Sequence, residues 1–163
     1  MDRQTIVAVL MLVVSNAAFA GDFEALFGIV PGERIPYLKG EFGQSPNNIY
    51  EKPVQGRQLA EFFQHIQVIV LPPDTVANFY AVRAYRGPVQ CLEDMASINQ
   101  IMMPLFPDSE EGNAYQRVSA DGGVRLSLGC GTDGRTPFYT LRMHVSHIES
   151  TSELTRQIFG PPG

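Results

Sequence analysis

The residues of this sequence that could perform chemistry are few and scattered. His144 and His147 form an H-x-x-H pair, a spacing compatible with zinc ligation. They fall in a segment with the alternation of a β-strand, where residues three apart point to opposite faces of the sheet. The two imidazoles therefore do not converge, and the sequence predicts no metal site and no bound cofactor.

Two other patterns also fail as chemical motifs. The segment 108–113 reads DSEEGN, but Gly112 stands where an EF-hand calcium loop needs its third ligand. Ser127 does not belong to a G-x-S-x-G nucleophile motif, because Arg125 replaces the first glycine. The sequence therefore predicts no catalytic residue.

Cys91 and Cys130 are the two cysteines of the chain, and their positions in two different periodic patterns predict a disulfide. Cys91 begins the apolar stripe of a predicted helix over 89–103. Cys130 is in phase with the apolar residues of a predicted strand over 124–130. Both sulfurs should therefore meet between helix and sheet, as expected of two cysteines in an exported protein.

Residues 1–20 have the pattern of a secretory signal peptide. The apolar run 6–14 is shorter than the roughly 20 apolar residues that span a bilayer. Ala18 and Ala20 form an A-x-A cleavage site. We expect a mature chain that begins at Gly21, resides in the periplasm or is secreted, and does not insert stably in the membrane. An uncleaved anchor helix or a different start site is the alternative.

The overall composition narrows the class of partner. The chain has 12 basic and 17 acidic residues, a net charge of −5, and no run of lysines and arginines. This charge distribution argues against nucleic-acid binding. An apolar content of 44% is typical of a folded domain.

Two regions are expected after the signal peptide. Residues 21–58 are rich in proline and glycine, which predicts an irregular segment with a helical turn at Asp22–Phe27. Aromatic residues recur through this segment, so we expect it to pack on the rest of the chain. Residues 59–163 are expected to form a single disulfide-linked domain.

The periodicities of residues 59–163 predict the order β-β-α-β-β-β-α. The expected elements are strands 62–71 and 78–86, helix 89–103, strands 115–120, 124–130 and 137–148, and a final helix with a capping box at Ser150 and Glu153. This order predicts an α+β fold with a mainly antiparallel sheet of about five strands and helices packed on one face.

A resemblance supports the same picture. Phe27-Gly28-Ile29 with Pro31-Gly32, the paired strands, the helix at Cys91 and the strand ending at Cys130 resemble small exported bacterial proteins of uncharacterised function. The resemblance implies a style of fold and a compartment, and it implies no activity.

Strand alternation also predicts an aromatic and basic outer sheet face. Its members would be Phe63, His65, Phe79, Arg83, Tyr85, Arg125, Arg142 and His144. From these we take Arg83, Arg142, His65, His144, Phe79 and Tyr85 as candidate binding residues. The alternative is that residues 21–58 cover the aromatic side chains.

These observations predict a small exported module that binds a protein or peptide, with an acidic partner to match the arginines and histidines. Two other classes remain open: a small extracytoplasmic hydrolase of unrecognised type, and an assembly component of the cell envelope.

Overall fold

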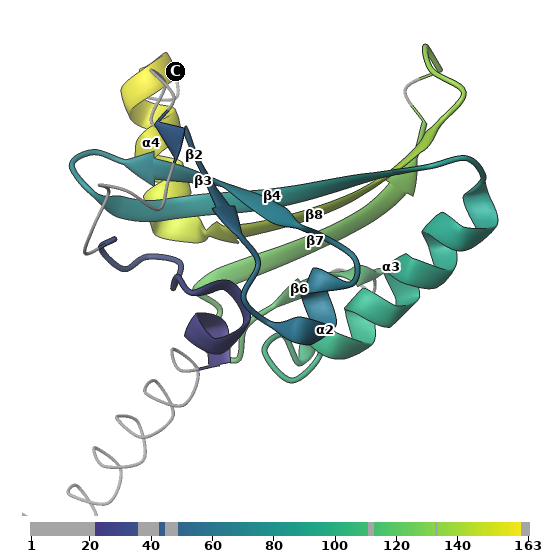
Figure 1. The fold of residues 1–163 in the computed structure, drawn as a ribbon. Helices are drawn as coiled ribbons and strands as arrows, with labels where there is room; N and C mark the ends of the chain where they lie inside the picture. The colour runs from purple at the N-terminus through teal and green to yellow at the C-terminus, as the bar shows by residue number, and fades with distance from the viewer. Residues whose placement is uncertain (1–21, 36–42, 45–48, 111–112, 133, 161–163) are drawn as a thin grey trace, which may run out of the picture.

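A single antiparallel sheet organises the molecule (Figure 1). The computed structural model describes residues 22–35, 43–44, 49–110, 113–132 and 134–160. Within them, eight strands are ordered β1-β2-β3-β4-β8-β7-β6-β5. The strands are β1 Gly43–Gln44, β2 Ile49–Pro53, β3 His65–Leu71, β4 Thr75–Tyr85, β5 Asp108–Glu110, β6 Asn113–Val118, β7 Val124–Gly131 and β8 Tyr139–His147. The helices are α2 Arg57–Ala60, α3 Pro88–Met102 and α4 Ile148–Phe159, and residues 22–27 are also helical.

The predicted α+β class is confirmed, although the sheet has more strands than the expected five. The additional strands β1, β2 and β5 lie at the two ends of the sheet. β2 falls in the segment expected to be irregular, and β5 falls in the acidic segment 108–113, where no strand was expected. Such edge strands are formed by pairing with a neighbour, so their own sequences carry little apolar alternation.

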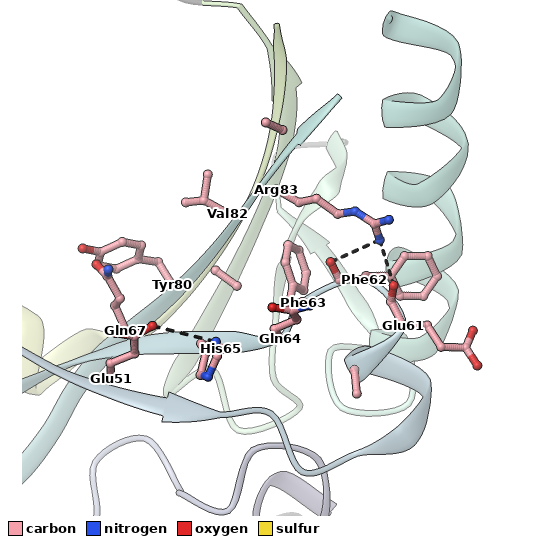
Figure 2. Close-up of a pocket in the computed structure, with 13 residues that line it drawn as sticks. Glu51, Glu61, Phe62, Phe63, Gln64, His65, Gln67, Tyr80, Val82 and Arg83 are labelled. Carbon is pink, nitrogen blue, oxygen red and sulfur yellow. Dashed lines mark hydrogen bonds and ion pairs between the residues drawn. The ribbon is translucent and has the colours of Figure 1, made fainter. Parts of the chain in front are cut away.

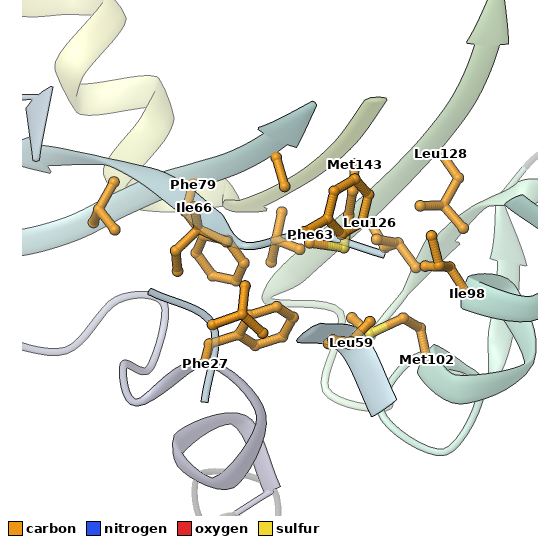
Figure 3. Packing of buried hydrophobic residues seen from close by; sticks show 14 of the residues in the cluster. Phe27, Leu59, Phe63, Ile66, Phe79, Ile98, Met102, Leu126, Leu128 and Met143 are labelled. Atoms are coloured by element: carbon orange, nitrogen blue, oxygen red, sulfur yellow. The ribbon is translucent and has the colours of Figure 1, made fainter. Parts of the chain in front are cut away.

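The inner face of the sheet carries the hydrophobic core (Figure 3). Alternate residues of the central strands β3, β4, β7 and β8 are buried there, as strand geometry requires. They include Ile66, Val68, Phe79, Leu126, Leu128, Leu141, Met143 and Val145. Helix α3 packs on this face through Cys91, Met95, Ile98 and Met102, which is the predicted stripe.

The disulfide between Cys91 and Cys130 is confirmed, with a Cα–Cα distance of 6.0 Å. It joins the first turn of α3 to the last residues of β7. The helical period and the strand period placed both sulfurs at this interface from the sequence.

The N-terminal segment completes the core. Phe23 and Phe27 are fully buried; the ring of Phe27 lies 4.6 Å from that of Phe79, and the ring of Phe23 lies 5.6 Å from that of Phe106. The segment therefore packs on the inner face, as its aromatic residues indicated. The predicted signal peptide lies outside the described residues.

Helix α4 lies on the opposite side of the sheet from α2 and α3 (Figure 1). Thr151 Oγ1 donates a hydrogen bond to the carbonyl oxygen of Ala77. The outer-face residues Asn78 and Ser146 are buried, while the part of the outer face farther along β4 is exposed. The helices thus lie on both faces of the sheet, whereas the sequence predicted helices on one face only.

The predicted capping box at Ser150 is wrong. The helix begins at Ile148, and His147 is its N-cap. Its Nδ1 accepts a hydrogen bond from the backbone N–H of Ser150 at 3.3 Å, and the Ser150 hydroxyl lies 2.8 Å from the same nitrogen. An imidazole nitrogen thus performs the capping role that a serine hydroxyl usually has. Glu153 is bound instead to Arg156 and Gln157.

The predicted common face for the six binding residues is also wrong. In the β4–β8 register, Phe79, Arg83 and Tyr85 pair with Val145, Leu141 and Tyr139 on the inner face. Arg142 and His144 pair with Val82 and Tyr80 on the outer face. Phe63, expected beside His65 outside, is buried in the core. The prediction placed Arg83 on the outer face because its side chain is charged. In the structure, Arg83 lies at the rim of the inner face, and its long side chain reaches polar partners beyond the core.

No helix in the described parts of the chain is long and apolar enough to cross a membrane.

Candidate functional site

The candidate site lies where β3 and β4 separate. The two strands pair from Leu71–Thr75 to Gln67–Tyr80, and β4 then continues to Tyr85 beside β8. Between the diverging segments is a cleft of about 520 Å³, within the range of binding pockets. It is lined by residues 60–65, residues 80–84, Glu51 and Gln67 (Figure 2).

The cleft runs along the edge of β4. Successive side chains of a strand point to opposite faces of the sheet. A cavity on one face would therefore touch alternate residues, yet this cleft touches every residue from Tyr80 to Ala84. The cleft is thus bounded by the main chain of β4 as well as by its side chains.

Arg83 spans the cleft in place of the strand pairing. Its Nη1 donates to the carbonyl oxygen of Glu61 at 2.8 Å and to that of Phe62 at 3.3 Å. The guanidinium also lies 5.3 Å from the centre of the Tyr85 ring. Figure 2 shows the side chain reaching from β4 to the segment that precedes β3. A side chain therefore fixes the distance between the two walls.

Asp94 of α3 anchors this bridge. Its Oδ2 accepts a hydrogen bond from the Tyr85 hydroxyl at 2.7 Å and lies 3.8 Å from Arg83 Nη1. Its Oδ1 accepts from Gln90 Nε2 at 2.7 Å. Burial, reinforced by the bond to Asp94, raises the pKa of Tyr85, so the phenol remains a donor at neutral pH. The cluster therefore joins α3 to the wall of the cleft.

The opposite rim carries a histidine and a carboxylate. His65 Nδ1 lies 3.8 Å from Glu51 Oε1, and the two side chains are about half exposed. An imidazole beside a carboxylate is an arrangement found in general bases.

The cleft opens onto the exposed part of the outer face. Tyr80 and Val82, which line the cleft, are the cross-strand partners of His144 and Arg142 on β8. Both β8 side chains are exposed, and neither has a hydrogen-bond or ion-pair partner among the described residues. Desolvation lowers the pKa of His144, so its imidazole is neutral at neutral pH. Arg142 is then the fixed positive charge of this surface.

The six predicted residues are thus divided among three places. His65 and Arg83 line the cleft, Arg142 and His144 lie on the adjoining outer face, and Phe79 and Tyr85 belong to the inner face. Sequence reasoning missed Tyr80, Gln67 and Glu61. The strand period would have placed Tyr80 with His144, given the register, but the place where β3 leaves β4 has no marker in the sequence.

In the described portion of the chain, no three His, Cys, Asp or Glu side chains gather as metal ligands would. Comparisons of the chain with protein-family models, curated proteins and solved structures found no match.

Proposed function

We propose that this chain is an exported binding module for a protein or peptide segment, and that the β3–β4 cleft with the adjoining outer face is its binding surface. The observation that carries the proposal is the continuity of the two features. A cleft along a strand edge leads directly to exposed polar side chains, among them Arg142 and His144. A groove of this kind suits an elongated partner, which would contact both features along its length.

The charges support an acidic partner. Arg142 is a positive charge with no ion pair among the described residues, and a guanidinium binds carboxylates in a paired geometry. Aromatic area for the contact comes from Tyr80, which is half-buried at the mouth of the cleft.

The disulfide supports the export part of the proposal. Disulfides persist in oxidising compartments and are rare in the cytosol, and the Cys91–Cys130 bond is part of this fold. Together with the A-x-A pattern at Ala18 and Ala20, it favours a periplasmic or secreted protein.

The test uses Arg142→Ser in the mature chain and a labelled peptide of alternating glutamate and threonine. An exposed charge pair contributes up to about 1 kcal/mol, or roughly a fivefold change in affinity. We expect a loss of that size with an unchanged melting temperature. The matched control is Arg156→Ser on α4, which should leave binding unchanged. Equal binding of the alternating lysine–threonine peptide would contradict the proposal.

A second function, that of a hydrolase, is favoured by one observation, the His65–Glu51 pair in the cleft. If the pair acts as a general base, the mature chain should hydrolyse members of an ester and peptide substrate panel. Glu51→Gln and His65→Gln should each then lower the rate by about 100-fold or more. Turnover that persists in both variants would reject this role for the pair.

A further inference from the structure

We infer that the partner segment binds as an added β-strand along the edge of β4 at residues 81–84, with an acidic side chain level with Val82. The inference rests on the proposed function and specifies how that surface recognises its partner. The occupant is an extended peptide segment, held chiefly by main-chain hydrogen bonds.

One edge of β4 is open along residues 81–84. Past the Gln67–Tyr80 pair, β3 no longer pairs with β4, while β8 continues to pair on the other side as far as Tyr85. In a strand, the main-chain groups of alternate residues point to alternate sides. Two of the four residues 81–84 therefore direct their N–H and C=O groups into the cleft.

The facing wall of the cleft does not compete for those groups. The carbonyl oxygens of Glu61 and Phe62 accept from Arg83, and the carbonyl oxygen of Gln64 accepts from the Val54 N–H. The N–H groups of Phe62 and Phe63 donate to the carbonyl oxygen of Leu59. These groups of the wall are paired with other parts of the chain, so an incoming strand would bond to β4.

The side chains of residues 81, 82 and 84 are small, and Val82 is 54% exposed. Arg83 is the one long side chain of the four. It leaves β4 on the inner face, beside its cross-strand partner Leu141, and crosses to the carbonyl oxygens of Glu61 and Phe62. An incoming backbone would therefore lie on the outer side of this bridge. An unpaired strand edge of this kind is a template for strand addition.

The side chains on the outer face beside this edge favour an acidic occupant. If the register of Gln67 with Tyr80 is extended by two residues, His65 stands level with Val82, whose β8 partner is Arg142. A carboxylate on the outer side of the added strand would lie between the His65 imidazole and the Arg142 guanidinium. Glu51 already lies beside His65, so Arg142 carries the preference for an acidic side chain at this level.

The experiment uses the mature, oxidised protein and three synthetic nonapeptides. The first is Thr-Val-Thr-Val-Glu-Val-Thr-Val-Thr, the second has lysine in place of glutamate, and the third is the first with alternate backbone nitrogens methylated. Affinity is measured by fluorescence anisotropy, and hydrogen exchange reports on the amides of residues 81–84.

We expect the glutamate peptide to bind at least fivefold more tightly than the lysine peptide and to slow exchange at residues 81–84 at least tenfold. Methylation should abolish binding, because it removes the main-chain donors. Val82→Lys, which places a charge on the edge, should weaken binding at least tenfold. Val89→Lys is the matched control, since Val89 is also exposed, on α3, and it should bind like the parent.

The outcomes separate the two claims. Strand addition would be overturned if methylation left binding unchanged and the amides of residues 81–84 gained no protection. If Arg142→Ser still weakened binding in that case, the proposed function would stand. Tighter binding of the lysine peptide would overturn the assigned charge. Failure of all three peptides to bind would overturn both the inference and the proposed function.

Discussion

Arg117 and Arg83 each hold a segment of chain by donating hydrogen bonds to main-chain carbonyl oxygens. Arg117 is buried, and its Nε and Nη2 bind the carbonyl oxygens of Phe106 and Pro107 at 2.6 and 2.8 Å. These carbonyls follow the end of α3, where helical hydrogen bonding has stopped. One side chain of β6 therefore fixes the path of the chain between α3 and β5.

Replacement of Arg117 by leucine should destabilise the protein by about 2–3 kcal/mol, because buried carbonyl oxygens lose their donors. The free energy of unfolding from urea titration measures the effect. Arg125→Leu is the control: Arg125 is about half exposed and paired with Glu110, so its loss should cost less than about 1 kcal/mol. Equal losses in both variants would contradict the role given to the buried arginine.

A second residue-scale prediction concerns Asp121 in the β6–β7 turn. The hydrogen bond from the Ser119 hydroxyl, and then that from the Gly123 N–H, lower the pKa of Asp121. A carboxyl group with a lowered folded-state pKa contributes stability above its ordinary pKa of about 3.9. That contribution is lost as the pH falls through the lower, folded value.

Asp121→Asn should therefore be less stable than the parent at pH 6, and the difference should disappear as the pH falls below the lowered pKa of Asp121. Thermal melts across this range test the expectation. In Ser119→Ala, a carboxyl-detected NMR titration should show the pKa of Asp121 shifted upward. A difference in melting temperature between the parent and Asp121→Asn that is the same at every pH would contradict the role given to the Asp121 carboxylate.

At the scale of elements, α3 and β7 are joined covalently as well as by packing. The disulfide closes a loop with a sequence separation of 39 residues, and in the chain-entropy model a crosslink of this span stabilises a fold by about 4 kcal/mol. Reduction should lower the melting temperature by about 10 °C. The double variant Cys91→Ala with Cys130→Ala should melt at that lower temperature with or without reductant. A parent protein whose melting is insensitive to reductant would refute this.

The helices and strands also show which features could be predicted from the sequence. The disulfide followed from the stripe of α3 and the alternation of β7, because each period is a local property of a buried element. The sequence did not predict which face of β4 is buried, because its two sets of alternate residues are similarly apolar. The charge of Arg83 led to the prediction that its set faces outward, whereas that set faces the core. The cleft was beyond prediction, because it depends on where β3 leaves β4, and local periodicity carries no signal for that point.

At the scale of the whole molecule, the N-terminal segment and the sheet share one core. Phe27 packs against Phe79 of β4, and Phe23 packs against Phe106 beyond α3. The segment also bonds to the sheet through its main chain, with the Gly32 N–H donating to the carbonyl oxygen of Val76. We therefore expect the segment and the sheet to unfold together.

Phe27→Ala should lower the free energy of unfolding by about 3–5 kcal/mol, the usual cost of truncating a fully buried phenylalanine. Urea titration should still give a single transition. Phe159→Ala is the matched control, since Phe159 is 81% exposed and its loss should change stability by less than about 0.5 kcal/mol. An unaltered stability in Phe27→Ala would place the segment outside the cooperative unit.

The bridge formed by Arg83 has a consequence for how such a cleft could diversify. A ladder of main-chain hydrogen bonds holds two strands at one fixed spacing of about 4.8 Å. A side chain instead sets a separation that depends on its own length and rotamer. Position 83 is therefore one place where a change of side-chain length would alter the width of the cleft, because Arg83 bonds to both Glu61 and Phe62 on the facing wall.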